Sequence, residues 1–356
     1  MQKVKFTQSL STPFYLEVKQ KVNAYFASRS NNRKANAHMR SKIILIFLIF
    51  FVSYGLLVSN VLSQTQMLFT TILFGLSNVL IAFNVAHDAS HDALFKKQKW
   101  NKLFSYSFNL IGVNQYIWDI KHNRSHHAFT NIEGLDMDIA QAKIARVVES
   151  SQRKWFHRYQ HIYLPFIYPT ASLFMIFVKD FQMFAVKKYG NSVHNGHPRK
   201  EYAILFISKL LYITYTLIIP MIVINLVWWK ILVGFLIMHL IMGVFLAIIL
   251  FPAHVLDDSP FPKPDDSMEI HNSWAIHQVE TTTNFAANSR LITWLAGGLN
   301  THIAHHLYPN ICHIYYYDLT KIIREVAQKH EISFRDKTMF GALKSHFAYF
   351  KRLGRK

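Results

Sequence analysis

Cysteine is almost absent from this chain, which has 356 residues and a single thiol, Cys312. Structural zinc sites usually use two to four cysteines, and an iron–sulfur cluster needs several thiolates, so neither site fits one cysteine. The zinc-protease pattern His-Glu-x-x-His is absent as well. A single cysteine is typical of a protein that faces a reducing compartment.

Acidic residues are also scarce, with 20 Asp and Glu against 39 Lys and Arg, which gives a net charge of +19. At the same time 51% of the residues are hydrophobic and 15% are aromatic. This mixture is unusual for a soluble enzyme and typical of a membrane protein with basic faces. We therefore expect anionic membrane lipids and acidic proteins as partners, and no nucleic acid.

Four apolar runs are each long enough to cross a bilayer, which takes about 20 residues. The first two are separated only by Ser63–Gln66 and the last two only by Lys230, so each pair predicts a helical hairpin. We expect an all-α integral membrane fold with four transmembrane helices. The predicted spans are Ile43–Leu62, Met67–Ala86, Leu210–Trp229 and Ile231–Phe251.

The distribution of positive charge predicts the orientation of these spans. The first 42 residues hold nine Lys or Arg and one acid, Glu17, whereas the two hairpin tips hold one Lys. The positive-inside rule then places both termini and the central region in the cytoplasm, and no signal peptide is expected. Two interrupted apolar stretches, Leu103–Trp118 and Ile162–Val178, are predicted to lie in the interface.

Three regions follow from this layout. We expect residues 1–42 to form a basic cytoplasmic segment, residues 43–320 the membrane domain, and residues 321–356 a second basic cytoplasmic segment.

Eight of the 20 histidines fall into three tight clusters. Residues three or four apart share one face of a helix, so each cluster predicts several imidazoles that point the same way. Imidazole is a common ligand of iron, copper and zinc, and three converging faces offer too many nitrogens for one ion. Chance could produce one pair but hardly three clusters, and we predict a metal pair. The ligands are His87 and His91; His122, His126 and His127; and His302, His305 and His306.

Further ligands and supporting groups can be named from position. His254 ends the fourth span at the level of His87 and is the predicted ninth ligand, while His277 is a further candidate. Metal-bound imidazoles usually donate their other N–H to a carboxylate or carbonyl. Acids that flank the clusters could accept these hydrogen bonds, although each could also be a solvated acid or a helix cap. They are Asp88, Asp92, Asp136, Asp138 and Glu280.

The three clusters, with His302-x-x-His305-His306 followed by Leu-Tyr-Pro, resemble the three histidine boxes of membrane fatty-acid desaturases. The flanking sequence is similar to the bacterial linoleoyl-CoA or front-end-like branch, and the resemblance covers roughly residues 40–320. Front-end enzymes typically begin the third box with Gln, whereas this chain has His302. A fused cytochrome b5 domain is not expected, because His197-Pro198 is followed by Arg.

This resemblance implies a di-iron enzyme of the bacterial inner membrane, with its histidine-rich metal site in a cytoplasmic cap. Such an enzyme inserts a C=C bond into an acyl chain with O₂ and two electrons, using two iron ions (Fe²⁺/Fe³⁺) and no other catalytic group. The electrons would come from a separate ferredoxin or cytochrome b5-type donor with its reductase. The acyl group could arrive as a CoA thioester, an acyl-carrier-protein thioester or a membrane lipid.

Two other classes of protein remain open from the sequence. A di-iron lipid or alkane hydroxylase, or a carotenoid oxygenase, would have similar histidine clusters and differ only in the product. A membrane metal transporter would be expected to place its ligands near the middle of the bilayer. The clusters here lie at or beyond the cytoplasmic ends of the predicted spans, which favours an enzyme.

Overall fold

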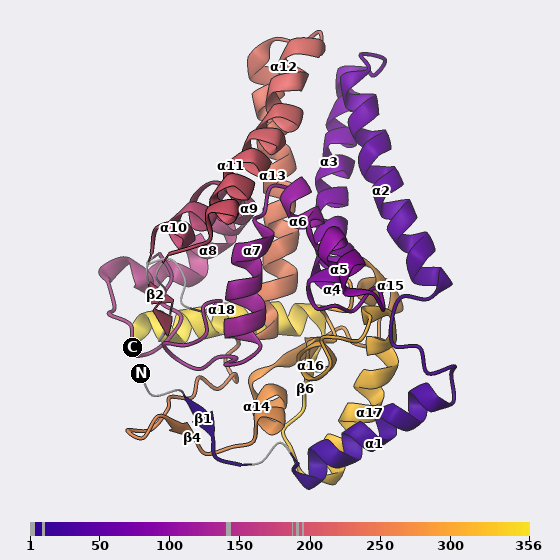
Figure 1. Cartoon of the computed structure of the whole chain (residues 1–356). Helices are drawn as coiled ribbons and strands as arrows, with labels where there is room; N and C mark the ends of the chain where they lie inside the picture. Colours follow the sequence, from indigo (N-terminus) through magenta and orange to yellow (C-terminus); the bar gives the residue numbers. More distant parts are fainter. Residues whose placement is uncertain (1–3, 9–10, 140–143, 187, 190–191, 194–195) are drawn as a thin grey trace.

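Two long helical hairpins stand above a cap of shorter helices in the computed structural model (Figure 1), which describes residues 4–8, 11–139, 144–186, 188–189, 192–193 and 196–356. In the first hairpin, Ser63 caps the second helix, and its hydroxyl and backbone N–H form a reciprocal capping box with Gln66. This second helix runs on without a break into the first histidine cluster. The hairpin comprises α2 (Ala37–Val58) and α3 (Gln64–Ile81), continued by η1 (Ala82–Ala86) and α4 (His87–Ser90).

The second hairpin begins earlier in the chain than the hydropathy predicts. Its first helix starts directly after Pro198, in a polar first turn, and the connection lies at 224–227 rather than at Lys230. Apolar runs do not show the polar turns that extend a helix, so the predicted span 210–229 starts too late and runs through the connection, whereas the predicted span 231–251 lies within the observed helix. The hairpin comprises α11 (Arg199–Ile213), η6 (Thr214–Ile218), α12 (Ile219–Val223), α13 (Trp228–Leu250) and η7 (Phe251–Ala253).

A third apolar segment, 155–185, is helical throughout, although its turns alternate between 3₁₀, α and π geometry. Together with the four hairpin segments it makes five helices that are long and apolar enough to cross a membrane. The stretch Ile162–Val178, predicted to be a helix in the interface, is thus helical although it contains Pro165 and Pro169. Its elements are η3 (Trp155–Tyr159), α8 (Gln160–Ile167), η4 (Tyr168–Thr170), α9 (Ala171–Phe174), η5 (Met175–Lys179) and α10 (Asp180–Ala185).

Residues 98–126, between the first hairpin and this segment, are divided into short helices and are not among the candidate spans. Asn114 caps one of them through a hydrogen bond from the N–H of Ile117, and this helix leads into the second histidine cluster. The elements are α5 (Gln98–Ser105), α6 (Ser107–Leu110), α7 (Gln115–Trp118) and η2 (Asp119–His126).

The remaining helices gather at the end of the molecule opposite the hairpin tips (Figure 1). The two terminal regions meet there, because Glu17 accepts hydrogen bonds from Lys329 and His330. The helices are α1 (Pro13–Ala27), α14 (Trp274–Thr281), α15 (Arg290–Leu295), α16 (His302–Leu307), η8 (His313–Tyr315), α17 (Tyr316–Lys329) and α18 (Met339–Arg355). Short strands pair as β1 (Lys5–Phe6) with β4 (Glu269–Ile270) and β5 (Thr283–Phe285) with β6 (Arg335–Lys337), both parallel, and β2 (Lys188–Tyr189) with β3 (Ser192–Val193), antiparallel.

The main apolar core follows the seam between α3 and α13 and continues down to the cap. Phe74, Met238 and Met242 are almost completely buried in this core. Close approach of the helices requires small residues: a Cβ at Gly243 would overlap the backbone carbonyl of Pro169 in η4. The segment 155–185 therefore crosses α13 in direct backbone contact.

Candidate metal centre

The histidine clusters lie on three helical segments that meet beneath the hairpins. The first follows the π-helical turn η1, the second lies within the π-helical segment η2, and the third forms α16. Extra residues inserted as π turns are frequent at functional sites because they rotate the following side chains relative to a regular α-helix. Here the inserted turns come directly before or within the segments that carry the imidazoles.

Eight imidazoles form two groups of four, and in each group one ligand atom per residue lies within 4.8 Å of all the others. We call them the first and second histidine groups. His127 lies at the same spacing from His305 and His306, one member of each group, and so sits between them. The first group is His87, His91, His122 and His305; the second is His126, His254, His302 and His306.

Several ring nitrogens of these groups lack hydrogen-bond partners in the part of the chain that the structure describes. They include both ring nitrogens of His87 and His305 and Nε2 of His91 and His306. Buried polar atoms are nearly always paired, because leaving one unpaired costs free energy. A metal ion in each group would satisfy these lone pairs, so the residues present fit a pair of metal ions.

A second layer of residues fixes the outer nitrogens of several of these rings. Nδ1 of His126 lies 2.9 Å from Asp136 Oδ2, and Nδ1 of His122 lies 3.2 Å from Asp138 Oδ2. Nδ1 of His306 lies 2.7 Å from the amide oxygen of Gln278. When Nδ1 carries the proton in such a pair, Nε2 keeps its lone pair for a metal.

Backbone carbonyls hold two further rings of the second group. Nδ1 of His302 lies 2.8 Å from the carbonyl oxygen of Leu299, and Nδ1 of His254 lies 3.4 Å from that of Thr281. The predicted ninth histidine, His254, therefore takes the same orientation as the histidines of the three clusters.

Electrostatics keep most of these imidazoles neutral. Burial lowers the pKa of His122 to about 3, although Asp138 opposes the shift. Burial and the neighbouring imidazoles hold the pKa of His91 and His305 well below the usual value. Burial alone would lower the pKa of His126, but Asp136 and Asp138 together raise this pKa above its usual value. Neutral imidazole is the form that binds metals, so binding at neutral pH requires little proton release.

The other predicted candidates are placed differently. Nε2 of His277 lies 2.8 Å from the carbonyl oxygen of Thr130, and Glu280 accepts a hydrogen bond from Asn272, so both side chains stand outside the two groups. Asp92 adopts a positive φ of 56° and its carbonyl accepts a hydrogen bond from Lys34. Asp88 lies 2.8 Å from Nδ1 of His313 and 4.0 Å from Nδ1 of His87.

Sequence reasoning missed two polar residues beside the site. Gln278 accepts a hydrogen bond from the Thr130 hydroxyl and contacts His306, and Asn131 donates its backbone N–H to Asp136. Their places in the sequence offered a signal, because Asn131 follows the second cluster closely and Gln278 is next to the candidate ligand His277. Amide and hydroxyl side chains occur in many kinds of site, so they do not indicate a metal site as a histidine cluster does.

An apolar cavity of about 210 Å³ adjoins both groups, and we call it the lower cavity. Its inner walls come from buried residues such as Phe83, Phe108 and Ile111, and it reaches His87, His126 and His302 among the site residues. Its lining also includes two partly exposed lysines, Lys121 and Lys179. The site therefore combines two histidine groups that could each hold a metal ion with an apolar cavity whose polar lining includes Lys121, Lys179 and Asp138.

Comparison with known proteins agrees with this chemistry. Residues 63–338 match the fatty acid desaturase family. An acyl-lipid (8-3)-desaturase of Physcomitrium patens is 32% identical over 99% of this chain and 74% of its own length. An sn-1 linoleoyl-lipid 6-desaturase of Arthrospira platensis is 31% identical over 99% of this chain and 95% of its own length. A relative of the latter name from Synechocystis is 29% identical over 98% of its own length.

Proposed function

This chain belongs to the fatty acid desaturase family, and we propose that each of its two histidine groups holds one iron ion. As a member of this family, it is a membrane-bound oxidoreductase that desaturates fatty acyl chains with O₂. The single observation that carries this proposal is the pairing of two buried four-histidine groups beside one apolar cavity. Imidazole is a suitable ligand for iron.

The ligands would be the nine predicted histidines. The first ion would be bound by His87, His91, His122 and His305, and the second by His126, His254, His302 and His306, with His127 between them. Asp136, Asp138 and Gln278 would hold ring orientations, and Asp88 would support His87 through its position beside that ring. His277, Asp92 and Glu280 would have structural roles outside the ligand set.

When bound, the metal pair supplies the oxidising power, derived from O₂ and two electrons, that breaking unactivated C–H bonds requires. The protein itself would orient the substrate. The buried apolar walls of the lower cavity exclude water and hold two neighbouring methylene groups against the histidine groups. A chain held in this way keeps the reacting C–H bonds next to the metal site, which lowers the entropic part of the activation barrier. The depth to which the chain enters the cavity would then determine which C–C bond becomes a double bond.

The polar end of the substrate would lie at the rim of the lower cavity. Lys121 is 2.6 Å from Asp138, and Lys179 is a second cation on the same rim. Because relatives are named acyl-lipid and linoleoyl-lipid desaturases, we favour a membrane lipid over a CoA or acyl-carrier-protein thioester as the acyl carrier. An ester and phosphate at this rim would meet positive charge while the chain enters the apolar interior.

We propose that four of the five apolar segments cross the membrane and that segment 155–185 does not. The first and second clusters precede this segment and the third follows it, so one isolated crossing would put ligands on opposite sides of the bilayer. Two contacts support a segment that enters and leaves on one side: its start packs on α18 at Gly354, and Asp180 near its end binds the N–H of Asn114.

The compartment and the electron donor follow from this topology. The positive-inside rule would place the cap, both termini and the metal centre in the cytoplasm, which for a bacterium makes the host bilayer the inner membrane. The membrane domain would span 43–320, flanked by the basic segments 1–42 and 321–356. A net charge of +19 suits an acidic donor, either a ferredoxin or a cytochrome b5-type protein with its reductase.

Metal analysis of the purified protein tests the ligand assignment. We expect two iron ions per chain in the wild type and about one in either His91→Ala or His306→Ala, because each variant opens one group. His271→Ala serves as the control, because this exposed histidine pairs with Asp265 away from both groups. Unchanged iron content in both variants would refute the assignment.

A further inference from the structure

A second apolar cavity lies between the two hairpins, nearer to their tips than the lower cavity. It has a volume of about 200 Å³, similar to the lower cavity, and is bordered by α2, α3, α12 and α13. Its inner end is lined by Phe74 and Met238, which are buried and do not line the lower cavity. We call this separate space the upper cavity.

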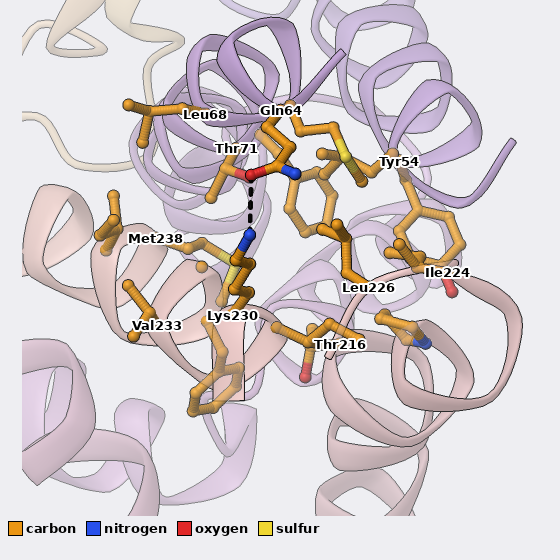
Figure 2. Close-up of a pocket in the computed structure, with 18 residues that line it drawn as sticks. Tyr54, Gln64, Leu68, Thr71, Thr216, Ile224, Leu226, Lys230, Val233 and Met238 are labelled. Carbon is orange, nitrogen blue, oxygen red and sulfur yellow. Dashed lines mark hydrogen bonds between the residues drawn. The ribbon is translucent and has the colours of Figure 1, made fainter. Parts of the chain in front are cut away.

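A lysine stands at the outer end of the upper cavity without an acid to neutralise it. The Lys230 ammonium donates a hydrogen bond of 2.9 Å to the side-chain oxygen of Gln64, the first residue of α3 (Figure 2). The two hairpin sequences, 43–87 and 202–256, contain no Asp or Glu. A neutral amide occupies one of the three ammonium donors and leaves the charge uncompensated. An anionic group is therefore the partner that suits this position.

A tyrosine hydroxyl lies deeper in the same cavity. Tyr54 lines the cavity four residues before the end of α2, about one helical turn inside it. Its buried hydroxyl has no hydrogen-bond partner among the residues that the structure describes. The ring packs against Phe74 and Tyr215, with ring centres 5.7 Å away in both cases. Because buried polar atoms are nearly always paired, this hydroxyl suits a ligand that offers an acceptor inside the cavity.

The upper cavity is accessible from the surface that would face lipid. Leu68 and Val233 line it from α3 and α13, and both side chains are exposed. Beside Lys230, α13 begins with two exposed tryptophans, Trp228 and Trp229. Tryptophan is enriched where a membrane meets water, so the lysine stands at the level of the lipid head groups.

We propose that the upper cavity binds an anionic phospholipid from the leaflet that holds the hairpin tips, with one acyl chain inside, the phosphate beside Lys230 and an ester group beside Tyr54. Polar groups at two depths match the phosphate and the ester carbonyl of a phospholipid, whereas a free fatty acid has a single polar end. The bound chain would fill the space between the hairpins and stabilise their contact at the tips. The inference rests on the proposed membrane crossing of both hairpins and not on the metal centre.

Native mass spectrometry of the purified full-length protein tests this binding. With dioleoyl-phosphatidylglycerol in the detergent, we expect one retained lipid in the wild type and about fivefold weaker binding in Lys230→Gln, the effect of removing one lysine near an anionic head group. Tyr54→Phe should weaken binding by a smaller factor. Lys99→Gln is the matched control, because Lys99 also lies 5.7 Å from a tryptophan ring, that of Trp100, but lines neither cavity.

Two other lipids identify the head group that is recognised. Dioleoyl-phosphatidylcholine, whose phosphate is balanced by choline, should bind the wild type more weakly and should not distinguish Lys230→Gln from Lys99→Gln. Binding of oleic acid without binding of phosphatidylglycerol would overturn the assignment to a phospholipid. Equal phosphatidylglycerol affinity in the wild type, Lys230→Gln and Lys99→Gln would overturn the proposal, because the lipid would then only coat the surface.

Photolabelling locates the acyl chain. Phosphatidylglycerol with a photoreactive group at the methyl end of one chain should label Phe74 or Met238 in the wild type. Gly234→Leu should lose this labelling because its side chain would enter the cavity, whereas Gly55→Leu, which lines neither cavity and meets no neighbour, should keep it. If Gly234→Leu does not accumulate, Lys230→Gln takes its place.

Labelling confined to lipid-facing side chains outside the cavity, such as Phe69, would contradict the proposed binding site. None of these readouts requires iron, turnover or a particular orientation in the membrane. Failure of the proposed desaturation chemistry would therefore leave them unchanged, and the two outcomes can be told apart.

Discussion

At the residue scale, the centre depends on which nitrogen of each ring is left free. Asp136 shows how this is arranged: one oxygen accepts from His126 and the N–H of Asn131, and the other accepts from the N–H of Asp138. Backbone N–H groups of its own loop thus hold the Asp136 carboxylate in place, and the carboxylate in turn orients the His126 ring. Such outer partners typically change metal affinity by about 10- to 100-fold when they are removed.

Two substitutions separate the ligand from its support. His126→Ala should abolish desaturation and lower iron content while the protein still inserts in the membrane. Asp136→Asn should keep the ligand but weaken iron binding roughly 10- to 100-fold, because a neutral amide stabilises the proton on Nδ1 less than a carboxylate and its NH₂ group cannot accept from the backbone N–H groups. Iron titration followed by optical or Mössbauer spectroscopy measures both effects. Wild-type activity and iron content in His126→Ala would show that this histidine is not a ligand.

Metal removal provides a further test at this scale. With the ions extracted by a chelator, neutral imidazoles are left buried and unpaired, as at His87 and His305. Binding of metal to the folded state should therefore stabilise it, and the chelated protein should melt at a lower temperature. A melting temperature that does not change after confirmed removal of iron would mean that the groups are satisfied without metal.

At the element scale, helices with irregular turns position the site. The π turns η1 and η2 come directly before and within the segments that carry His87 and His126, and segment 155–185 reaches α13 only because Gly243 has no side chain. This crossing brings α9 and η5 against α13, where both line the lower cavity.

Gly243→Leu should disrupt this crossing. Its side chain would overlap the Pro169 backbone, which cannot move as a flexible side chain could, so we expect a loss of at least ~2 kcal/mol in stability and a distorted lower cavity. Gly234→Ala on the same helix is the control, because a Cβ there meets no neighbour. Thermal unfolding in detergent compares the two, and equal melting temperatures would contradict the packing described.

At the scale of the whole molecule, the sequence predicted the features that depend on long apolar runs and on histidine clusters, but not the polar contacts of residues such as Asn131 and Gln278. The helical membrane fold and the two hairpins could be predicted because long apolar runs leave few alternatives in a bilayer. Eight of the histidines that gather in the structure were named because three imidazole clusters at helical spacing rarely arise away from a metal site, and the ninth, His254, was named from its place at the end of the fourth predicted span. The start of α11 at Arg199 could not be predicted, because its first turn is polar and lies outside the apolar run.

Labelling of single cysteines tests the proposed topology. In a Cys312→Ser background, cysteines introduced at Asn60 and Asn225, at the two hairpin tips, should react with an impermeant maleimide added outside intact cells. A cysteine at Glu331, in the cap, should react only after the cells are opened. Labelling of Glu331→Cys in intact cells would contradict the proposed orientation.

The most direct measurement is the mass of the product made by a host that expresses this chain, beside a host that expresses His126→Ala. Gas chromatography–mass spectrometry of derivatised fatty acids reports both the mass change and the bond position. We predict a product two mass units lighter than its precursor, present with the wild type and absent with the variant. A product sixteen units heavier would show that oxygen is inserted instead, and would contradict desaturation at this centre.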